Sequence, residues 1–280
     1  MSVAHAREFE LSDRDFEFIR SLVTGRTGIV LSAQKRELVY GRVVRRLRQL
    51  GLSSFSDYCA LLQQKPDAEV PELVNAVTTN LTSFFREQHH FDYLQRDLLP
   101  KLLKQKAATR RLRIWSAGCS TGEEPYSIAM VVRELIPSGA GWNVKILATD
   151  IDTEVLARAS DGVYARDRIN GLSAERARRW FLHGSGGQSG KVRVKDELKS
   201  LIAFRPLNLM DAWPMRGPLD IIFCRNVVIY FDKPTQAKLF DRFANLLGSG
   251  NHLFVGHSES LHNVCSRFQP LGHTVYTRTS

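Results

Sequence analysis

The chain has 280 residues, of which 43% are hydrophobic and 24% are charged, which is the composition of a globular protein and excludes a disordered or fibrous one. No apolar run approaches the roughly 18 residues of a membrane-spanning helix, and the N-terminal stretch MSVAHAREFELSDRD lacks the apolar segment of a signal peptide. The net charge of +10 permits nucleic acid, an anionic membrane surface or an acidic protein as partner, and does not choose among them.

The first 88 residues predict a small helical bundle with four helices. Ser12 is the expected N-cap of the first helix, and Gly51 is the expected C-terminal stop of the second. The second helix has one apolar face, which is made by Val39, Val43, Leu47 and Leu50. A linker helix over residues 89–109 is expected to follow the bundle.

From about residue 110, strand-like segments alternate with helical ones. The segments RLRIWSAG, WNVKILATD and LDIIFCRNVVIYF read as strands, and patterns such as EPYSIAMVVRELI read as helices between them. This alternation is typical of a mostly parallel, doubly wound α/β sheet. Residues 163–205 depart from it, because the glycine-rich HGSGGQSG and the alternating KVRVK predict an inserted hairpin with its own edge strands.

The cysteines and histidines give no sign of a metal site. Cys59, Cys119, Cys224 and Cys265 lie far apart without a CxxC pair, which argues against structural zinc and disulfides and fits a reducing cytoplasm. The eight histidines lack ligand spacing on a common helix face. We therefore expect no metal.

The loop AGCSTGEE follows the first strand of the alternating region, where a doubly wound sheet binds its ligand. Gly118 and Gly122 do not make the GxGxxG pattern of a dinucleotide site. Glu123 and Glu124 would repel a pyrophosphate at the helix N-terminus, so they favour a cationic or amphoteric ligand. The alternative is that both glutamates only complement the helix dipole.

Polar residues stand at the ends of the later strands. Asp150 could accept hydrogen bonds from the hydroxyl groups of a ribose, and Asn208 could offer its amide to an adenine edge. Arg225 and Asn226 adjoin a strongly apolar run, where burial without a partner is costly. A nucleoside that carries a positive charge and an amino-acid tail fits this set, and that description is S-adenosylmethionine.

At these residues the chain resembles the CheR-type glutamate methyltransferases of bacterial chemoreceptors. The resemblance rests on motifs in family order along nearly the whole chain: RRLRQLG, TTNLTSFFRE, STGEEPYS, ATDIDTEVL, FCRNVVIYFD, GHSES and the closing TVY. The combination of NLTSFFRE, STGEEPYS and CRNVVIYF is far more specific than any single glycine loop. The resemblance implies transfer of a methyl group from S-adenosylmethionine to receptor glutamates, with γ-glutamyl methyl esters and S-adenosylhomocysteine as products and no metal.

The family also implies a fold. It has an N-terminal helical domain (here residues 1–88), a linker (89–109) and a Rossmann-like methyltransferase domain (110–280) with a small antiparallel β-subdomain inserted at about 163–205. The segment NLTSFFRE is expected to be the contribution of the N-terminal domain to the cofactor pocket. Its two phenylalanines, Phe84 and Phe85, are expected to pack in the core.

Site residues carry over from the family position by position. Arg86 and Tyr230 are implied near the transferred methyl group. The implied cofactor contacts are Asn80, Thr82, Arg86, Glu124, Asp150, Asn208, Leu209, Arg225 and Asn226.

The implied partner is the helical cytoplasmic domain of chemoreceptors. Arg42, Arg45 and Arg46 are expected to dock on its acidic methylation region, although a solvated helix face is the plainer reading. The insertion holds ten lysines and arginines against four acidic residues. It is similar to the family branch that binds a receptor's C-terminal aromatic and acidic pentapeptide by strand addition, with Val192, Arg193 and Val194 as the expected contacts.

Two other functions remain open on the sequence. The charge and the cofactor would permit a nucleic-acid (RNA) methyltransferase, but no NPPY-like or DPPY-like motif follows the fourth strand. A non-catalytic scaffold that keeps the cofactor only as a ligand is the second alternative, against which Arg86 and Tyr230 speak. We expect a monomeric cytoplasmic enzyme that is recruited to receptor clusters at the inner membrane, with no nucleic-acid partner and no insertion into the membrane.

Overall fold

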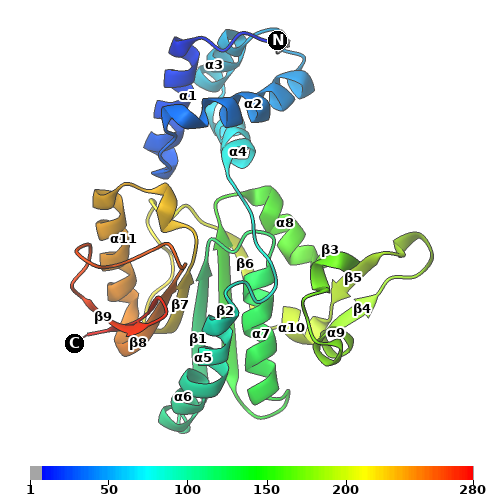
Figure 1. Cartoon of the computed structure of the whole chain (residues 1–280), viewed down its shortest axis with the longest axis vertical. Helices are drawn as coiled ribbons and strands as arrows, with labels where there is room; N and C mark the ends of the chain where they lie inside the picture. The colour runs from blue at the N-terminus through cyan, green and yellow to red at the C-terminus, as the bar shows by residue number, and fades with distance from the viewer. Residues whose placement is uncertain (1–7, 280) are drawn as a thin grey trace, which may run out of the picture. The chain divides into compact units, whose positions relative to one another are not determined.

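The computed structural model describes residues 8–279 and resolves into two compact units. The first ends at Thr79 and also includes Tyr230–Asp232, and the second comprises Asn80–Ile229 and continues from Lys233. Each unit has its own architecture (Figure 1). Residues 80–88, which the sequence assigned to the helical domain, are grouped with the second unit.

The first unit is helical, as predicted. Its elements are α1 (Asp13–Thr27), a 3-10 turn (Ala33–Lys35), α2 (Arg36–Leu50), α3 (Phe55–Gln64) and α4 (Pro66–Val77). Ser12 caps α1 by accepting a hydrogen bond from the backbone N–H of Asp15, and Gly51 ends α2 in the left-handed conformation with φ 65°. Val39, Val43 and Leu47 are fully buried on one face of α2, whereas Leu50 at its end is exposed.

A continuous helical segment opens the second unit. It consists of α5 (Gln88–Tyr93), a π-turn (Leu94–Leu98) and α6 (Leu99–Gln105). Phe91, Leu94 and Leu98 are buried in the core cluster that also contains strand residues. Burial of these side chains holds this helical segment against the sheet of the second unit.

The second unit is built on a seven-stranded sheet. Its strands are β1 (Arg111–Ala117), β2 (Asn143–Asp150), β6 (Ile202–Pro206), β7 (Leu219–Cys224), β8 (Leu247–Val255), β9 (Phe268–Gly272) and β10 (Val275–Arg278). The order is β6-β2-β1-β7-β8-β10-β9, in which the first five are parallel and β10 and β9 add an antiparallel edge (Figure 1). The predicted α/β sheet is confirmed.

Helices cover both faces of this sheet. The side chain of Ile114 on β1 lies in the same apolar cluster as the buried residues of α7 (Glu123–Leu135). Its neighbour Trp115 points to the other face and packs edge-on against Phe243 of α11 (Lys233–Leu246), with ring centroids 5.4 Å apart. Because alternate strand residues face opposite sides, α7 and α11 belong to different layers. Within residues 8–279, no helix is both long enough and apolar enough to cross a membrane.

The insertion after α8 (Thr153–Asp161) forms a separate antiparallel sheet, as predicted. Its strands β3 (Val163–Ala165), β4 (Phe181–His183) and β5 (Lys191–Val194) are ordered β3-β5-β4 and lie beside α8, away from the β9 edge of the main sheet (Figure 1). Two short helices, α9 (Ala174–Trp180) and α10 (Asp196–Lys199), complete it. Phe84 anchors it through edge-on contacts with Tyr164 and Phe181, at centroid distances of 5.1 and 5.4 Å.

Candidate functional site

Most of the predicted cofactor residues gather at the carboxyl ends of β1, β2 and β7. The chain runs outward from β1 to β2 and later returns to place β7 on the other side of β1. The order of strands therefore reverses between β1 and β7, which is the position where doubly wound sheets bind ligands.

The loop over residues 118–122 folds onto the end of β2. The backbone N–H groups of Gly118 and Cys119 donate to the carbonyl oxygen of Thr149, at 2.8 and 2.9 Å. A Cβ atom at Gly118 would lie 2.4 Å from a methyl carbon of Val227, and Gly118 has φ +81°. Glycine is required here because the loop approaches the segment after β7 closely and in a left-handed conformation.

Asp150 is buried where this loop meets β2. One carboxylate oxygen accepts the backbone N–H of Ser120 at 2.8 Å, and the other accepts that of Asp152 at 3.0 Å. Burial raises the pKa of Asp150 to about 6 against the pull of these hydrogen bonds. The helix-capping role that competes with ligand binding falls to Asp152, whose side chain accepts the N–H groups of Glu154 and Val155.

The two glutamates of the loop are buried and paired inside the protein. Glu124 accepts the hydroxyl of Ser116 at 2.7 Å and pairs with Arg225 at 3.0 Å. Glu123 accepts the hydroxyl of Thr121 at 2.6 Å and pairs with Arg168 of the insertion. Both carboxylates thus organise the first turn of α7 in addition to complementing its dipole.

Arg225 links three segments of the site. Its guanidinium pairs with Glu124 and, at 3.2 Å, with Glu87, and it donates to the carbonyl oxygen of Arg86. It also lies over the ring of Phe91, 5.6 Å from the centroid. The cost of burying this charge is offset by two carboxylates, which explains an arginine at the end of an apolar strand.

The segment over residues 80–87 lines the same region. Asn80 donates its amide to Asp152 at 2.7 Å, and its carbonyl oxygen accepts the hydroxyl of Ser120 at 2.9 Å. The carbonyl oxygen of Thr82 accepts a hydrogen bond from Arg168 at 2.7 Å. Arg86 is half-buried and donates to the carbonyl oxygen of Leu81 at 2.7 Å, which curls the segment on itself. Because the segment belongs to the second unit, it is not a contribution of the helical unit.

The phenylalanines of this segment pack in the core, as predicted. Phe84 and Phe85 are 9% and 7% exposed and belong to the main apolar cluster. The backbone N–H of Phe85 donates to the hydroxyl of Ser127 at 3.0 Å, although Phe85 adopts a left-handed φ of 53°. Packing and this hydrogen bond hold the neighbouring polar residues in place.

Asn208 and Leu209 follow β6. The side-chain oxygen of Asn208 accepts the N–H of Met210 at 3.0 Å, which forms a turn, and its amide lies 3.3 Å from the carboxylate of Asp211. Leu209 is buried, and its carbonyl oxygen accepts a hydrogen bond from Arg242. The turn presents Asn208 at the carboxyl end of the sheet, next to β2.

Asn226 begins the turn that follows β7. It has a left-handed φ of 58°, and its amide lies 3.4 Å from a carboxylate oxygen of Glu87. Tyr230 ends the 3-10 turn Val228–Tyr230. Tyr230, which is expected near the transferred methyl group, is grouped with the first unit, whereas the predicted cofactor residues belong to the second.

Three site residues were missed by the sequence reasoning: Glu87, Arg168 and Glu259. Glu87 and Glu259 lie inside the motifs NLTSFFRE and GHSES, so a signal for them was present. Burial would raise the pKa of Glu87, but the hydrogen bond from His257 and the charge of Arg225 lower it to about 2. Arg168 lies in the insertion, and no local pattern marks it.

Among residues 8–279, Glu87, His89 and His90 bring ligand atoms within 4.8 Å of one another and are the residues that could hold a metal. His90 is buried and bonds through Nε2 to the carbonyl oxygen of His273 at 2.8 Å. Arg225 already stands 3.2 Å from the Glu87 carboxylate, and its charge opposes a divalent cation at that oxygen. The expectation of no metal stays a prediction.

The three arginines expected to dock on receptors differ in their surroundings. Arg46 is held by the buried Glu69 through two hydrogen bonds of 2.7 Å, and Glu69 also accepts the hydroxyl of Tyr58. Arg42 reaches the hydroxyl of Thr79 at 3.3 Å. Arg45 is exposed to solvent and is the member of the set best placed for a partner.

The expected peptide contacts lie on β5, which pairs with β3 on one side and β4 on the other. Val192 and Val194 are buried, and the half-exposed Arg193 lies 3.8 Å from Asp196. β5 is a middle strand without a free edge, and the expected contacts of Val192, Arg193 and Val194 with a receptor peptide stay a prediction. A strand added to this sheet must pair with β3 or β4.

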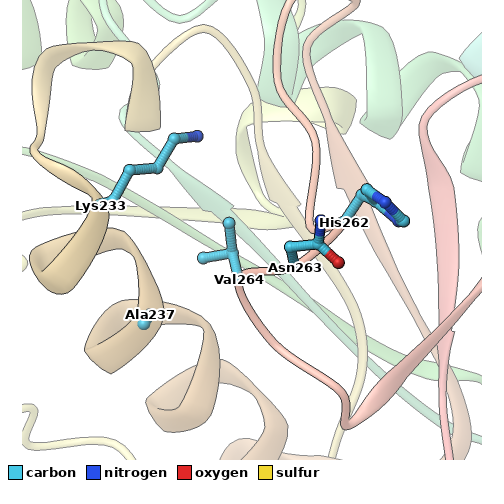
Figure 2. A pocket seen from close by; sticks show the side chains of 5 residues that line it. All are labelled: Lys233, Ala237, His262, Asn263 and Val264. Atoms are coloured by element: carbon cyan, nitrogen blue, oxygen red, sulfur yellow. The ribbon is translucent and has the colours of Figure 1, made fainter.

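A shallow depression of about 300 Å³ lies elsewhere in the second unit. Figure 2 shows its lining between the start of α11 and the segment before β9: Lys233, Ala237, His262, Asn263 and Val264. His262 and Asn263 are exposed, and the predicted cofactor residues are absent from this lining. The depression is therefore separate from the site at the strand ends.

Comparison with models of protein families shows the family of this chain. The family described as "CheR methyltransferase, SAM binding domain" matches residues 80–277, and "CheR methyltransferase, all-alpha domain" matches residues 14–78. The chain belongs to the CheR methyltransferase family. The border between the two matched domains coincides with the border between the two structural units.

Individual CheR relatives match over nearly their whole length. A chemotaxis protein methyltransferase of Klebsiella aerogenes is 46% identical, covering 98% of this chain and 92% of the relative. Chemotaxis protein methyltransferase 2 of Pseudomonas aeruginosa is 47% identical, covering 97% of this chain and 95% of the relative. The chemotaxis protein methyltransferase of Escherichia coli is 45% identical, covering 95% of this chain and 91% of the relative.

Proposed function

We propose that this protein transfers methyl groups from S-adenosylmethionine to glutamate side chains of chemotaxis receptors, forming γ-glutamyl methyl esters and releasing S-adenosylhomocysteine. The observation that carries the proposal is the match to both CheR domains together with 45–47% identity to proteins named chemotaxis protein methyltransferases. No comparable observation supports RNA methylation or a non-catalytic scaffold.

The residues at the strand ends fit the cofactor. Asp150 has carboxylate lone pairs left beyond its two backbone hydrogen bonds, so it can accept the hydroxyl groups of a ribose. The loop with Gly118 supplies close-packed backbone beside it. Asn208 would face the base, and Asn80, Thr82, Leu209 and Asn226 would complete the enclosure. The bound cofactor would supply an activated methyl group on a sulfonium.

The reaction makes modest demands on the chain. A glutamate carboxylate is ionised at pH 7, so no general base is needed. The protein must align this carboxylate with the donor and exclude water from it. Arg86 is half-buried beside the site and supplies a positive charge that can steer the incoming carboxylate. Tyr230 is proposed as the second residue near the methyl group.

Two surfaces are proposed to recruit the receptor. Arg45 on α2 is exposed and would meet the acidic methylation region of the receptor helices. The small sheet would bind a receptor's C-terminal peptide by strand addition at β4, where Leu182 is 46% exposed. We also propose that the protein is a monomer and that it is recruited to receptor clusters.

The test uses purified protein, tritiated S-adenosylmethionine and membranes rich in chemoreceptors. We expect base-labile radioactivity in the receptor band, and its loss in an Arg86→Ala variant. Arg96→Ala is the matched control, because Arg96 is an exposed arginine of the same unit. Label that resists base, or label found only in added RNA, would overturn the proposal.

A further inference from the structure

Two residues of the motif GHSES adjoin the site, because His257 bonds to Glu87 and Glu259 reaches the loop after β7. Glu259 is buried, with 4% of its surface exposed. Its carboxylate accepts four backbone N–H groups, from Gly256, Asn226, Val227 and Ile229. A carboxylate surrounded by peptide donors in the interior is a strong and directional anchor.

The four hydrogen bonds are divided between the two oxygens. Oε1 accepts Val227 at 2.8 Å and Ile229 at 3.3 Å, and Oε2 accepts Asn226 at 2.9 Å and Gly256 at 2.5 Å. Because Asn226 has a left-handed φ of 58°, the chain leaves the strand pattern here and these N–H groups lose their sheet partners. Glu259 supplies the missing acceptors.

Gly256 allows the two loops to approach. A Cβ atom at this position would lie 2.5 Å from the Asn226 side-chain nitrogen and 2.8 Å from its backbone nitrogen. Both distances are shorter than real contacts, so a side chain would push residue 226 away. The glycine and the glutamate of GHSES therefore act on the same segment.

A third residue of the motif reaches the other side of the site. Nδ1 of His257 lies 3.0 Å from Oε1 of Glu87, the carboxylate that also pairs with Arg225. The amide of Asn226 points to the same oxygen at 3.4 Å. Residues 256–259 thus join the loop after β7 to the segment NLTSFFRE.

We propose that Glu259 is a positioning residue for methyl transfer: it fixes residues 226–229 and thereby sets Asn226 against the cofactor and the start of the turn that leads to Tyr230. This inference rests on the proposed function, because Asn226 and Tyr230 matter only if methyl transfer occurs here. Glu259 itself touches backbone N–H groups and is not a catalytic residue.

The test compares Glu259→Gln with Asp220→Asn. Glutamine places an amide group against two of the four donors, so the loop loses half of its acceptor and gains a repulsive contact. Asp220 is an equally buried carboxylate at the opposite end of β7, where it accepts the N–H of Arg113 at 2.7 Å and pairs with Lys106. Both variants replace one buried carboxylate that lies near an end of β7, but only Glu259 adjoins the site.

Each variant is assayed well below its melting temperature, where circular dichroism shows it folded. For Glu259→Gln we expect at least a tenfold fall in kcat/KM, with a higher KM for S-adenosylmethionine, and upfield shifts of the amide protons of Asn226, Val227, Ile229 and Gly256. For Asp220→Asn we expect a lower melting temperature with KM and kcat unchanged. Equal kinetic losses in both variants would reduce Glu259 to a structural role and overturn the proposal.

A second variant guards against failure of Glu259→Gln to fold. Gly256→Ala keeps the carboxylate but displaces residue 226, and we expect the same rise in KM with a smaller change in stability. Unchanged kinetics in Gly256→Ala would contradict the inference. Calorimetry of S-adenosylhomocysteine binding separates this inference from the proposed function. Weaker binding in the variants supports the positioning role of Glu259, whether or not the wild-type protein methylates a receptor. A wild-type protein that methylates no receptor would count against the proposed function alone.

Discussion

Arg225 and Glu124 form a buried ion pair, with a guanidinium nitrogen 3.0 Å from a carboxylate oxygen, between the end of β7 and the first turn of α7. The pair joins two segments that are 101 residues apart in the sequence. The pair lies at the N-terminus of α7, directly after the loop for which the sequence predicted a ligand. Glu124 thus acts first on a residue of its own chain, and the cofactor would meet a site in which Arg225 is already paired.

We predict that Glu124→Ala lowers both stability and cofactor affinity. Breaking one partner of a buried pair costs about 3–5 kcal/mol, and Glu87 would keep part of the compensation for Arg225. Urea unfolding measures the first effect and titration with S-adenosylhomocysteine the second. Glu154→Ala on the exposed surface of α8 is the control and should change neither. A wild-type unfolding free energy in Glu124→Ala would contradict the coupling described here.

Asp150 should make cofactor binding depend on pH. Burial holds the pKa of this carboxyl at about 6 in the free protein. Ribose hydroxyl groups donate to the ionised form, so binding favours loss of the proton. The affinity for S-adenosylhomocysteine should therefore fall as the pH drops from 7 to 5. Calorimetry of the Asp150→Asn variant is the comparison. We expect this variant to bind S-adenosylhomocysteine weakly, with an affinity that does not change between pH 7 and pH 5. A wild-type affinity that is flat between pH 7 and pH 5 would remove Asp150 from the cofactor contacts.

The arginines of α2 should separate into stability and docking roles. Arg46→Ala leaves the buried Glu69 with Tyr58 as its remaining polar partner. We expect the free energy of unfolding to fall by about 2 kcal/mol, a value between those of exposed and buried ion pairs. Arg45→Ala should leave the free energy of unfolding within about 0.5 kcal/mol of the wild-type value. It should instead raise the KM for the receptor, most clearly at low salt. Chemical denaturation and receptor methylation assays read out the two effects, and a reversed pattern would contradict the assignment.

The small sheet should bind a receptor peptide at β4. Leu182→Asp on this exposed edge should weaken binding of an aromatic and acidic pentapeptide at least tenfold, because strand addition places the peptide against Leu182. Val163→Asp is the matched control on β3, where the side chain is 41% exposed on the opposite edge. Fluorescence anisotropy of a labelled peptide measures both variants. A loss confined to Val163→Asp would move the site to β3, and no binding to the wild-type protein would exclude this partner.

Local patterns in the sequence were sufficient for most of the helices and for the parallel strands. Ser12 caps α1 and Gly51 ends α2 as expected, because each role depends on backbone groups within a few residues. The alternation of strand and helix predicted the parallel sheet, and with it the position of Asp150 and Arg225 at the strand ends. Phe84 and Phe85 were placed in the core by their hydrophobicity alone.

The pairing of charges and the order of strands were decided only in three dimensions. No spacing in the sequence shows that Arg225 faces Glu124 and Glu87, that Glu259 takes four backbone hydrogen bonds, or that β5 lies between β3 and β4. Each of these depends on which distant segments the packed core brings together. Patterns in the sequence therefore predicted the family, most of the elements and most residues at the strand ends. The tertiary structure decided which of those residues hold one another in place, because the free energy of a buried charge is set by its neighbours in space.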